Sequence, residues 1–150
     1  MAGVGIFAQV LPVAFSTVTK TLVQFVPPAN QRIVVNEWDV SFNGTSNTAT
    51  PIEVDIVRQT SAGTSSALTI RKRNTSDSET VQSSALQTFT AEPTDGGDVP
   101  LSEQVHPQTG YTWQPGYGRE VSIPGGGRLG LRLVTPGAGA NATARLAGEE

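Results

Sequence analysis

Apolar and polar residues alternate along two runs of the chain between positions 31 and 59. The apolar positions are Val34, Trp38, Val40 and Phe42 in the first run, and Ile52, Val54 and Ile56 in the second. Asn36 interrupts the first run. A period of two predicts β-strands with one buried and one wet face. The connection, NGTSNTAT, is too long for a tight two-residue turn, so it forms either a projecting loop or a crossing between two sheets.

The same alternation returns in residues 119–135, on both sides of a glycine-rich bend. Val121 and Ile123 precede Pro124-Gly-Gly-Gly, and Leu129, Leu131 and Leu133 follow it. We expect a β-hairpin here. A phosphate-binding loop would have to open a helix and carry a Gly-Lys-Ser/Thr ending, which this segment lacks.

No long window of the chain follows a helical period without a Gly or Pro break. Short apolar runs recur at roughly ten-residue spacing, which is typical of antiparallel all-β folds. The sequence therefore predicts one all-β domain, a single antiparallel β-sandwich of jelly-roll or Greek-key type.

The first 19 residues carry no charged side chain. No basic residue precedes Lys20, and Gln9 and Pro12 interrupt the apolar run, so we expect neither an export signal nor a membrane span. We expect residues 1–12 to form an extended N-terminal arm and residues 13–150 the sandwich. The arm would contact another subunit through apolar side chains, with packing against its own domain as the alternative. These candidate interface residues are Ile6, Phe7, Val10 and Leu11.

Composition narrows the function classes without naming one. The net charge is −3 and the ten basic residues are scattered, apart from residues 71–73, so a nucleic-acid-binding face is not expected. The chain has no cysteine, which leaves no disulfide, thiolate nucleophile or thiolate metal ligand.

A second candidate surface is aromatic. Tyr111 and Trp113 lie on one parity of a short run, and Tyr117 follows a Pro-Gly turn. We expect these rings to cap the end of the core. Stacking on a sugar and contact with another subunit are the alternatives.

Catalytic and metal-binding patterns are weak. Glu37, Asp39, Glu53 and Asp55 fall on the polar positions of the two runs, and like charges placed opposite each other destabilise a sheet. Their strands are therefore not neighbours, or cations lie between them, or calcium binds there; we expect solvated or paired charges and no cofactor. His106, the only histidine, has no defined partner for acid–base chemistry, so we expect no enzyme.

Several segments resemble small β-sandwich proteins encoded among the structural genes of tailed bacteriophages. The segments are VNEWDVSFNG (35–44), RQTSAG (58–63), Ala91-Glu-Pro, His106-Pro-Gln and IPGGGRLGL (123–131). Some members of that group are head decoration, or cement, proteins. The resemblance spans most of the chain beyond about residue 13, but its motifs are strand and turn signatures that carry no chemistry.

The resemblance implies a virion protein that is made in the host cytoplasm and binds the outer surface of the capsid in many copies. Its partners would be the major capsid protein and itself, as a homotrimer, and it would reinforce the shell. The N-terminal arm, with Ile6, Phe7, Val10 and Leu11, would then lie over the capsid or a neighbouring subunit. The alternative is a carbohydrate- or receptor-binding module of a tail fibre or secreted protein, which would use Tyr111, Trp113 and Tyr117.

Overall fold

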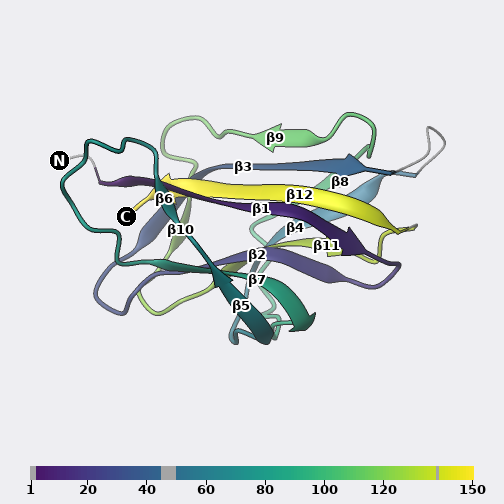
Figure 1. Cartoon of the computed structure of the whole chain (residues 1–150), viewed down its shortest axis with the longest axis horizontal. Coiled ribbons are helices and arrows are strands. Elements are labelled where there is room, and N and C mark those ends of the chain that lie inside the picture. Colours follow the sequence, from purple (N-terminus) through teal and green to yellow (C-terminus); the bar gives the residue numbers. More distant parts are fainter. Residues whose placement is uncertain (1–2, 45–49, 138) are drawn as a thin grey trace.

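The computed structural model describes residues 3–44, 50–137 and 139–150. These residues form two antiparallel sheets and no helix, and 56% of the chain is strand. Figure 1 shows the strands running mostly along the long axis, with the loops gathered at the two ends. The expected all-β class is confirmed, and the arrangement is consistent with a β-sandwich.

Each sheet has six strands among the described residues. The first sheet, sheet A, has the order β10-β3-β12-β1-β6, and β9 also pairs with β3. Its strands are β1 (Gly5–Phe15), β3 (Ile33–Asn43), β6 (Arg71–Lys72), β9 (Tyr111–Trp113), β10 (Val121–Ile123) and β12 (Ala140–Glu149). The second, sheet B, has the order β5-β7-β2-β11-β4-β8. Its strands are β2 (Lys20–Val26), β4 (Ile52–Arg58), β5 (Thr64–Leu68), β7 (Ser84–Ala91), β8 (Leu101–Val105) and β11 (Leu129–Val134).

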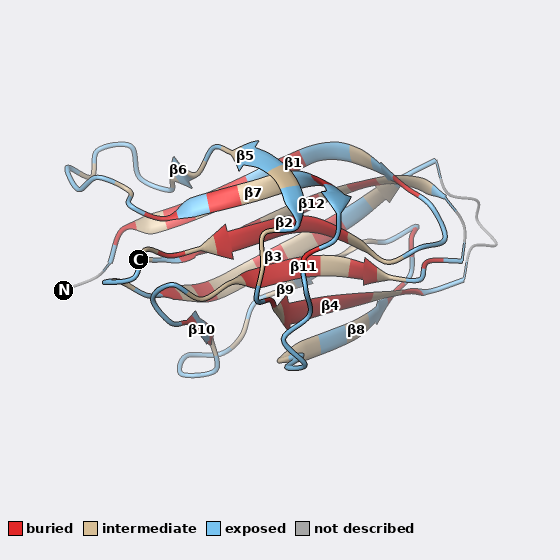
Figure 2. Ribbon diagram, turned by 90° about the horizontal axis from the view of Figure 1, so that it is seen from below, coloured by how far each residue is buried: buried red, intermediate tan, exposed pale blue. Residues whose placement is uncertain are grey.

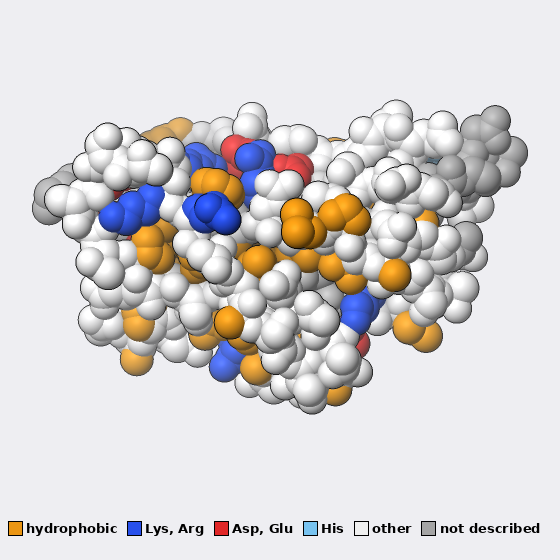
Figure 3. All heavy atoms as spheres, viewed as in Figure 1, with side chains coloured by type: hydrophobic (Ala, Val, Ile, Leu, Met, Phe, Trp, Pro, Cys, Tyr) orange, Lys and Arg blue, Asp and Glu red, His pale blue; other side chains and the backbone are white. Residues whose placement is uncertain are grey.

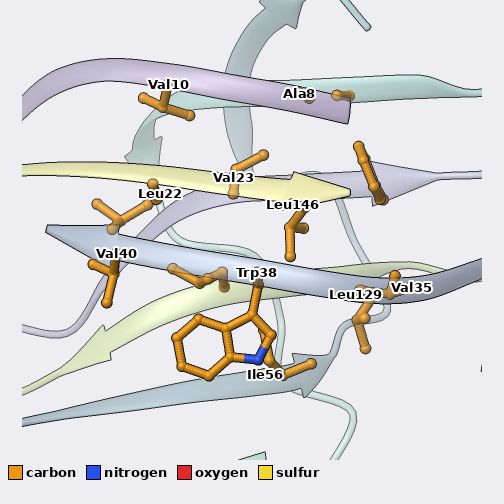
Figure 4. Packing of buried hydrophobic residues seen from close by; sticks show 14 of the residues in the cluster. Ala8, Val10, Leu22, Val23, Val35, Trp38, Val40, Ile56, Leu129 and Leu146 are labelled. Carbon is orange, nitrogen blue, oxygen red and sulfur yellow. The ribbon is translucent and has the colours of Figure 1, made fainter. Parts of the chain in front are cut away.

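The core lies between the two sheets and is built from the apolar positions of the alternating runs. Trp38 of β3, Ile56 of β4 and Leu146 of β12 are buried almost completely and belong to one cluster (Figure 4). Figure 2 shows the buried positions concentrated on the long strands and the exposed ones on loops and edge strands. Burying one such side chain contributes roughly 1.5–3 kcal/mol, so this shared core is what holds the sheets together.

A β-bulge changes the expected parity of β3 near its start. Ala147 pairs with Glu37 but Gly148 pairs with Val35, so Asn36 is an extra residue on β3. Val35 therefore faces the core with 1% exposure, and Val34, which strict alternation placed inside, is only partly buried. The break at Asn36 in the sequence pattern is this bulge.

The expected arm of residues 1–12 is corrected by the structure. From Gly5 the chain is β1, which lies between β12 and β6 inside sheet A. Its pairing with β12 runs from Gly5 opposite Glu149 to Phe15 opposite Ala140. The sandwich therefore starts at the beginning of β1, because apolar residues that a free arm would expose are buried between the sheets.

The expected hairpin of residues 119–135 is also wrong. β10 pairs with β3 in sheet A, whereas β11 pairs with β2 and β4 in sheet B. The bend itself is present, since the N–H of Gly127 donates to the carbonyl of Pro124 at 2.8 Å. The glycine-rich bend thus carries the chain from one sheet to the other. The connection from β3 to β4 is likewise a crossing, although residues 45–49 of that loop lie outside the described part.

Candidate interaction surfaces

Alternation along β1 divides the four predicted interface residues into two pairs. Ile6 and Val10 point into the core and have 0% and 1% exposure. Phe7 is half-buried on the opposite face, and Leu11 is 76% exposed. Ile6 and Val10 are therefore core residues of this chain, and of the four predicted residues Phe7 and Leu11 are the two with exposed surface.

Phe7 and Leu11 line a groove of about 360 Å³ where β1 passes the edge of sheet B. The remaining lining residues are Gln9, Ala67, Leu68, Thr69, Arg71 and Gln87. Figure 3 shows hydrophobic side chains spread across the middle of this face, with Lys or Arg side chains beside them. The groove therefore offers apolar contact and amide groups, with one cation.

The three predicted aromatic residues do not form one platform. Tyr111 and Trp113 lie on β9, and both pack partly against the core. The ring of Tyr111 lies 5.2 Å from that of Trp38, centroid to centroid. Tyr117, in contrast, is fully exposed in the following loop. The expected capping of the core holds for Tyr111 and Trp113, and Tyr117 remains as a single exposed ring.

Tyr111 also has a shifted titration. Partial burial, followed by the nearby negative charge and hydrogen bond of Glu103, raises the pKa of the Tyr111 phenol above its usual value of 10.0. Glu103 belongs to β8, the edge strand of sheet B, so this contact joins β8 to β9 of sheet A. A phenol that stays protonated at neutral pH serves here as a hydrogen-bonding group.

The four carboxylates of the alternating runs are separated by the fold. Glu37 and Asp39 lie on β3 of sheet A, and Glu53 and Asp55 lie on β4 of sheet B. The described residues contain no group of three or more His, Cys, Asp or Glu side chains that would hold a metal ion. The strands of the two runs are therefore not neighbours, and the expected pairing of the charges with cations is present as well, at three of the four carboxylates.

Cations nevertheless pair with the carboxylates of β3. Arg145 of β12 binds Asp39 through Nε at 2.7 Å and contacts Glu37 through Nη2. Arg73 approaches Glu37 from the other side, with 3.4 Å between Nη2 and Oε2. Such surface pairs are worth little singly, but a shared network orders the outer face of sheet A. The sequence does not predict this contact, because Arg145 lies 106 residues from Asp39. The only indication in the sequence is that Arg145 occupies a polar position in an alternating run.

A second network covers the outer face of sheet B. Gln24 of β2, with 0% exposure, donates to Gln59 Oε1 at 2.6 Å and accepts from Arg128 at 2.9 Å. Gln59 in turn donates to the hydroxyl of Thr21 at 3.2 Å. Buried amides are tolerated when their hydrogen bonds are made. These contacts hold β2 to the neighbouring residues Gln59 and Arg128.

The segment of residues 92–98 lies over this network and is held by charge. Arg132 of β11 bridges Asp95 at 2.7 Å and Asp55 at 3.2 Å. The backbone N–H of Gly97, followed by Arg132, lowers the pKa of Asp95 below its usual 3.8. Burial alone would lower the pKa of Arg132, but its bonds to Asp95 and Asp55 outweigh burial and raise it. Asp95 and Arg132 therefore stay ionised at neutral pH, and their ion pair serves as a clasp for this segment.

His106 has a structural role in the described chain. Its Nδ1 accepts from the backbone N–H of Gln108 at 3.2 Å, and its carbonyl accepts from that of Thr109 at 3.1 Å. The side chain is exposed and stabilises the turn before β9.

Among the described residues there is no helix with the length and apolar character that a membrane crossing needs. Comparison with family models, with curated proteins and with solved structures finds no match for this chain.

Proposed function

We propose that this chain is a non-enzymatic structural protein of a tailed-phage virion. It decorates the outside of the head, binds the major capsid protein and stabilises the shell. The jelly-roll or Greek-key type of the sandwich, a homotrimeric state and synthesis in the host cytoplasm belong to the same proposal. Its starting point is the resemblance of the strand and turn motifs to phage β-sandwich proteins.

The observation that carries the proposal is a contrast between two kinds of side chain among the described residues. Charged and amide groups are engaged in holding the sheets, as in the Arg145 and Arg132 networks. Exposed large apolar side chains are few, and Leu11 is the most exposed aliphatic one, beside the groove of β1. A domain with a small exposed apolar surface suits attachment to a regular lattice.

Physical chemistry explains how weak single contacts can reinforce a shell. Burying one leucine contributes roughly 1.5–3 kcal/mol per copy. A protein that binds the assembled lattice but not the free subunits shifts the equilibrium toward the lattice. Repeated over many copies, this small term stabilises the particle against dissociation.

The test uses particles from a phage that carries this gene, with the gene deleted. Adding back the purified protein should restore co-sedimentation with the particles and raise their resistance to heat. Leu11→Asp should reduce co-sedimentation, whereas Val99→Asp, at another exposed apolar position, should not. Particles whose heat resistance is the same with and without the protein would contradict the proposal.

A carbohydrate-binding module is the second candidate. It is favoured by the complete exposure of Tyr117 and the partial exposure of Trp113. In that case Tyr117→Ala and Trp113→Ala would abolish binding to a glycan array while leaving attachment to particles unaffected. Loss of particle attachment in Leu11→Asp, with no glycan signal for the unmodified protein, would favour decoration.

A further inference from the structure

The hydrogen-bonding direction of β1 follows from its first contacts. The N–H of Val4 donates to the carbonyl of Glu150 at 3.0 Å, and the N–H of Glu150 donates back at 3.1 Å. In an antiparallel ladder every second residue faces the same neighbour, so Ile6, Ala8 and Val10 also turn their backbone groups toward β12. The intervening residues turn theirs the other way. Gly5 confirms this, because its carbonyl accepts from the N–H of Arg73 at 2.7 Å.

On that other side β1 has a partner only at its start. β6 pairs with β1 at two positions, Ile6 opposite Lys72 and Phe7 opposite Arg71. Figure 1 shows β1 continuing well past the short β6. No strand in the described part of the chain pairs with this side of β1 beyond Phe7. The backbone N–H and C=O groups of Gln9, and the N–H of Leu11, therefore face an open edge.

The open edge forms one wall of the groove already described. Phe7, Gln9 and Leu11 line it from β1, and residues 67–69 and Gln87 line it from sheet B. Arg71 stands at the Phe7 end, and no carboxylate is among the lining residues. An occupant must supply backbone hydrogen bonds, apolar side chains toward Leu11 and Leu68, and negative charge near Arg71.

We propose that this edge binds an extended peptide segment of a partner protein, which adds to sheet A as a short antiparallel strand beside Gln9 and Leu11. The carboxyl end of the segment, or an acidic residue there, would lie next to Arg71. An antiparallel strand brings its carboxyl end to the Phe7 end of β1, which is where Arg71 lies. Strand addition of this kind takes affinity from main-chain hydrogen bonds and specificity from flanking side-chain pockets.

The shape of the groove favours a single extended segment over a second folded copy. Its walls come from both sheets, so it is concave and narrow. The β1 edge of a second copy would bring its own β5–β6 connection against this one. The bulge between Val10 and Val13, with Pro12 inside it, limits the open edge to a few residues. A short edge that ends at a proline also disfavours uncontrolled edge-to-edge association.

The experiment selects binders from a library of randomised ten-residue peptides with free carboxyl ends, using the purified chain of 150 residues. Enriched peptides should show alternating β-branched residues and an acidic or free carboxyl end. On binding, the amides of Gln9 and Leu11 should shift in NMR spectra and become protected from hydrogen exchange, while those of Ala8 and Val10 are already protected.

Variants of one position isolate the backbone contribution. Gln9→Pro removes the edge-facing N–H without touching the β12 ladder, and should weaken the selected peptide about tenfold or more. Gln9→Ala keeps that N–H and should bind within about twofold. Arg71→Glu should weaken binding of the free-acid peptide more than of its amidated form. This last comparison stands even if Gln9→Pro fails to fold.

Several results would overturn the inference. They are the absence of enriched peptides, amide shifts away from β1, and equal binding to Gln9→Pro and Gln9→Ala. A concentration-dependent dimer that Gln9→Pro disrupts would assign the edge to a second copy instead. The inference rests on the proposed function only for the identity of the protein that supplies the segment. Peptide binding without attachment to particles would overturn decoration alone, and normal attachment of Gln9→Pro would overturn the edge alone.

Discussion

Two substitutions in the same strand test whether β1 belongs to the core. Ile6→Ala and Leu11→Ala remove apolar atoms from residues five positions apart. Ile6 is fully buried between the sheets, whereas Leu11 is 76% exposed. If β1 were a loosely attached arm, neither change would alter the free energy of unfolding appreciably.

The expected magnitude follows from burial. Isoleucine to alanine removes three carbon atoms, worth about 2.4 kcal/mol at ~0.8 kcal/mol per buried CH₂. The cavity left beside the packed neighbours raises the cost to about 2–5 kcal/mol. For a domain of this size the melting temperature should fall by about 4–20 °C. Leu11→Ala should change stability by no more than about 0.5 kcal/mol.

Urea denaturation followed by tryptophan fluorescence measures both variants. Trp38 is completely buried, so its emission should shift to the red on unfolding. The urea midpoint of Ile6→Ala should fall while the slope of its unfolding transition stays the same, and the midpoint of Leu11→Ala should remain unchanged. Equal midpoints for the two variants, or a loss below about 1 kcal/mol for Ile6→Ala, would refute the placement of β1.

Three further predictions address other parts of the fold. Gly130→Ala would place a methyl group against the side-chain amide of Gln59, and moving that amide would break its hydrogen bonds with Gln24 and Thr21. The variant should therefore lose about 1–3 kcal/mol in urea denaturation, and an unchanged midpoint would argue against close packing over sheet B. Because the pKa of Asp95 is lowered in the folded state, its bond with Arg132 stabilises the protein above pH 3.8 and is lost as the pH falls through that lowered pKa. Asp95→Asn should therefore be less stable than the unmodified protein at pH 7, and the difference should shrink as the pH falls through the lowered pKa of Asp95, whereas a difference that stays constant with pH would contradict the clasp. Deleting residues 1–11 removes most of β1 and should give unfolded or aggregated protein by circular dichroism and size exclusion, and a cooperatively melting monomer would show that β1 is dispensable.

Alternation predicted the class of the fold and much of the core. Ile52, Val54 and Ile56 are buried as expected, because a period of two states directly which face of a strand is dry. The alternation does not indicate which strand pairs with which. The runs that flank Pro124 read as a hairpin, yet a bend followed by alternation looks the same when the chain crosses to the other sheet.

The contacts missed from the sequence are those that join distant segments. Arg145 meets Asp39, and Arg132 meets Asp95 and Asp55, only after the strand order is set. The N-terminal residues were misplaced for a related reason. An uncharged apolar run suits both an interface and a central strand, and only its pairing with β12 distinguishes the two.

The most direct test of the proposed function is the copy number of this chain in purified particles of a phage that carries its gene. Quantitative mass spectrometry against the major capsid protein would supply the ratio. Decoration predicts a simple, fixed ratio to the shell protein. A few copies per particle would place the chain in the tail or a fibre, and its absence from the particle would contradict the account.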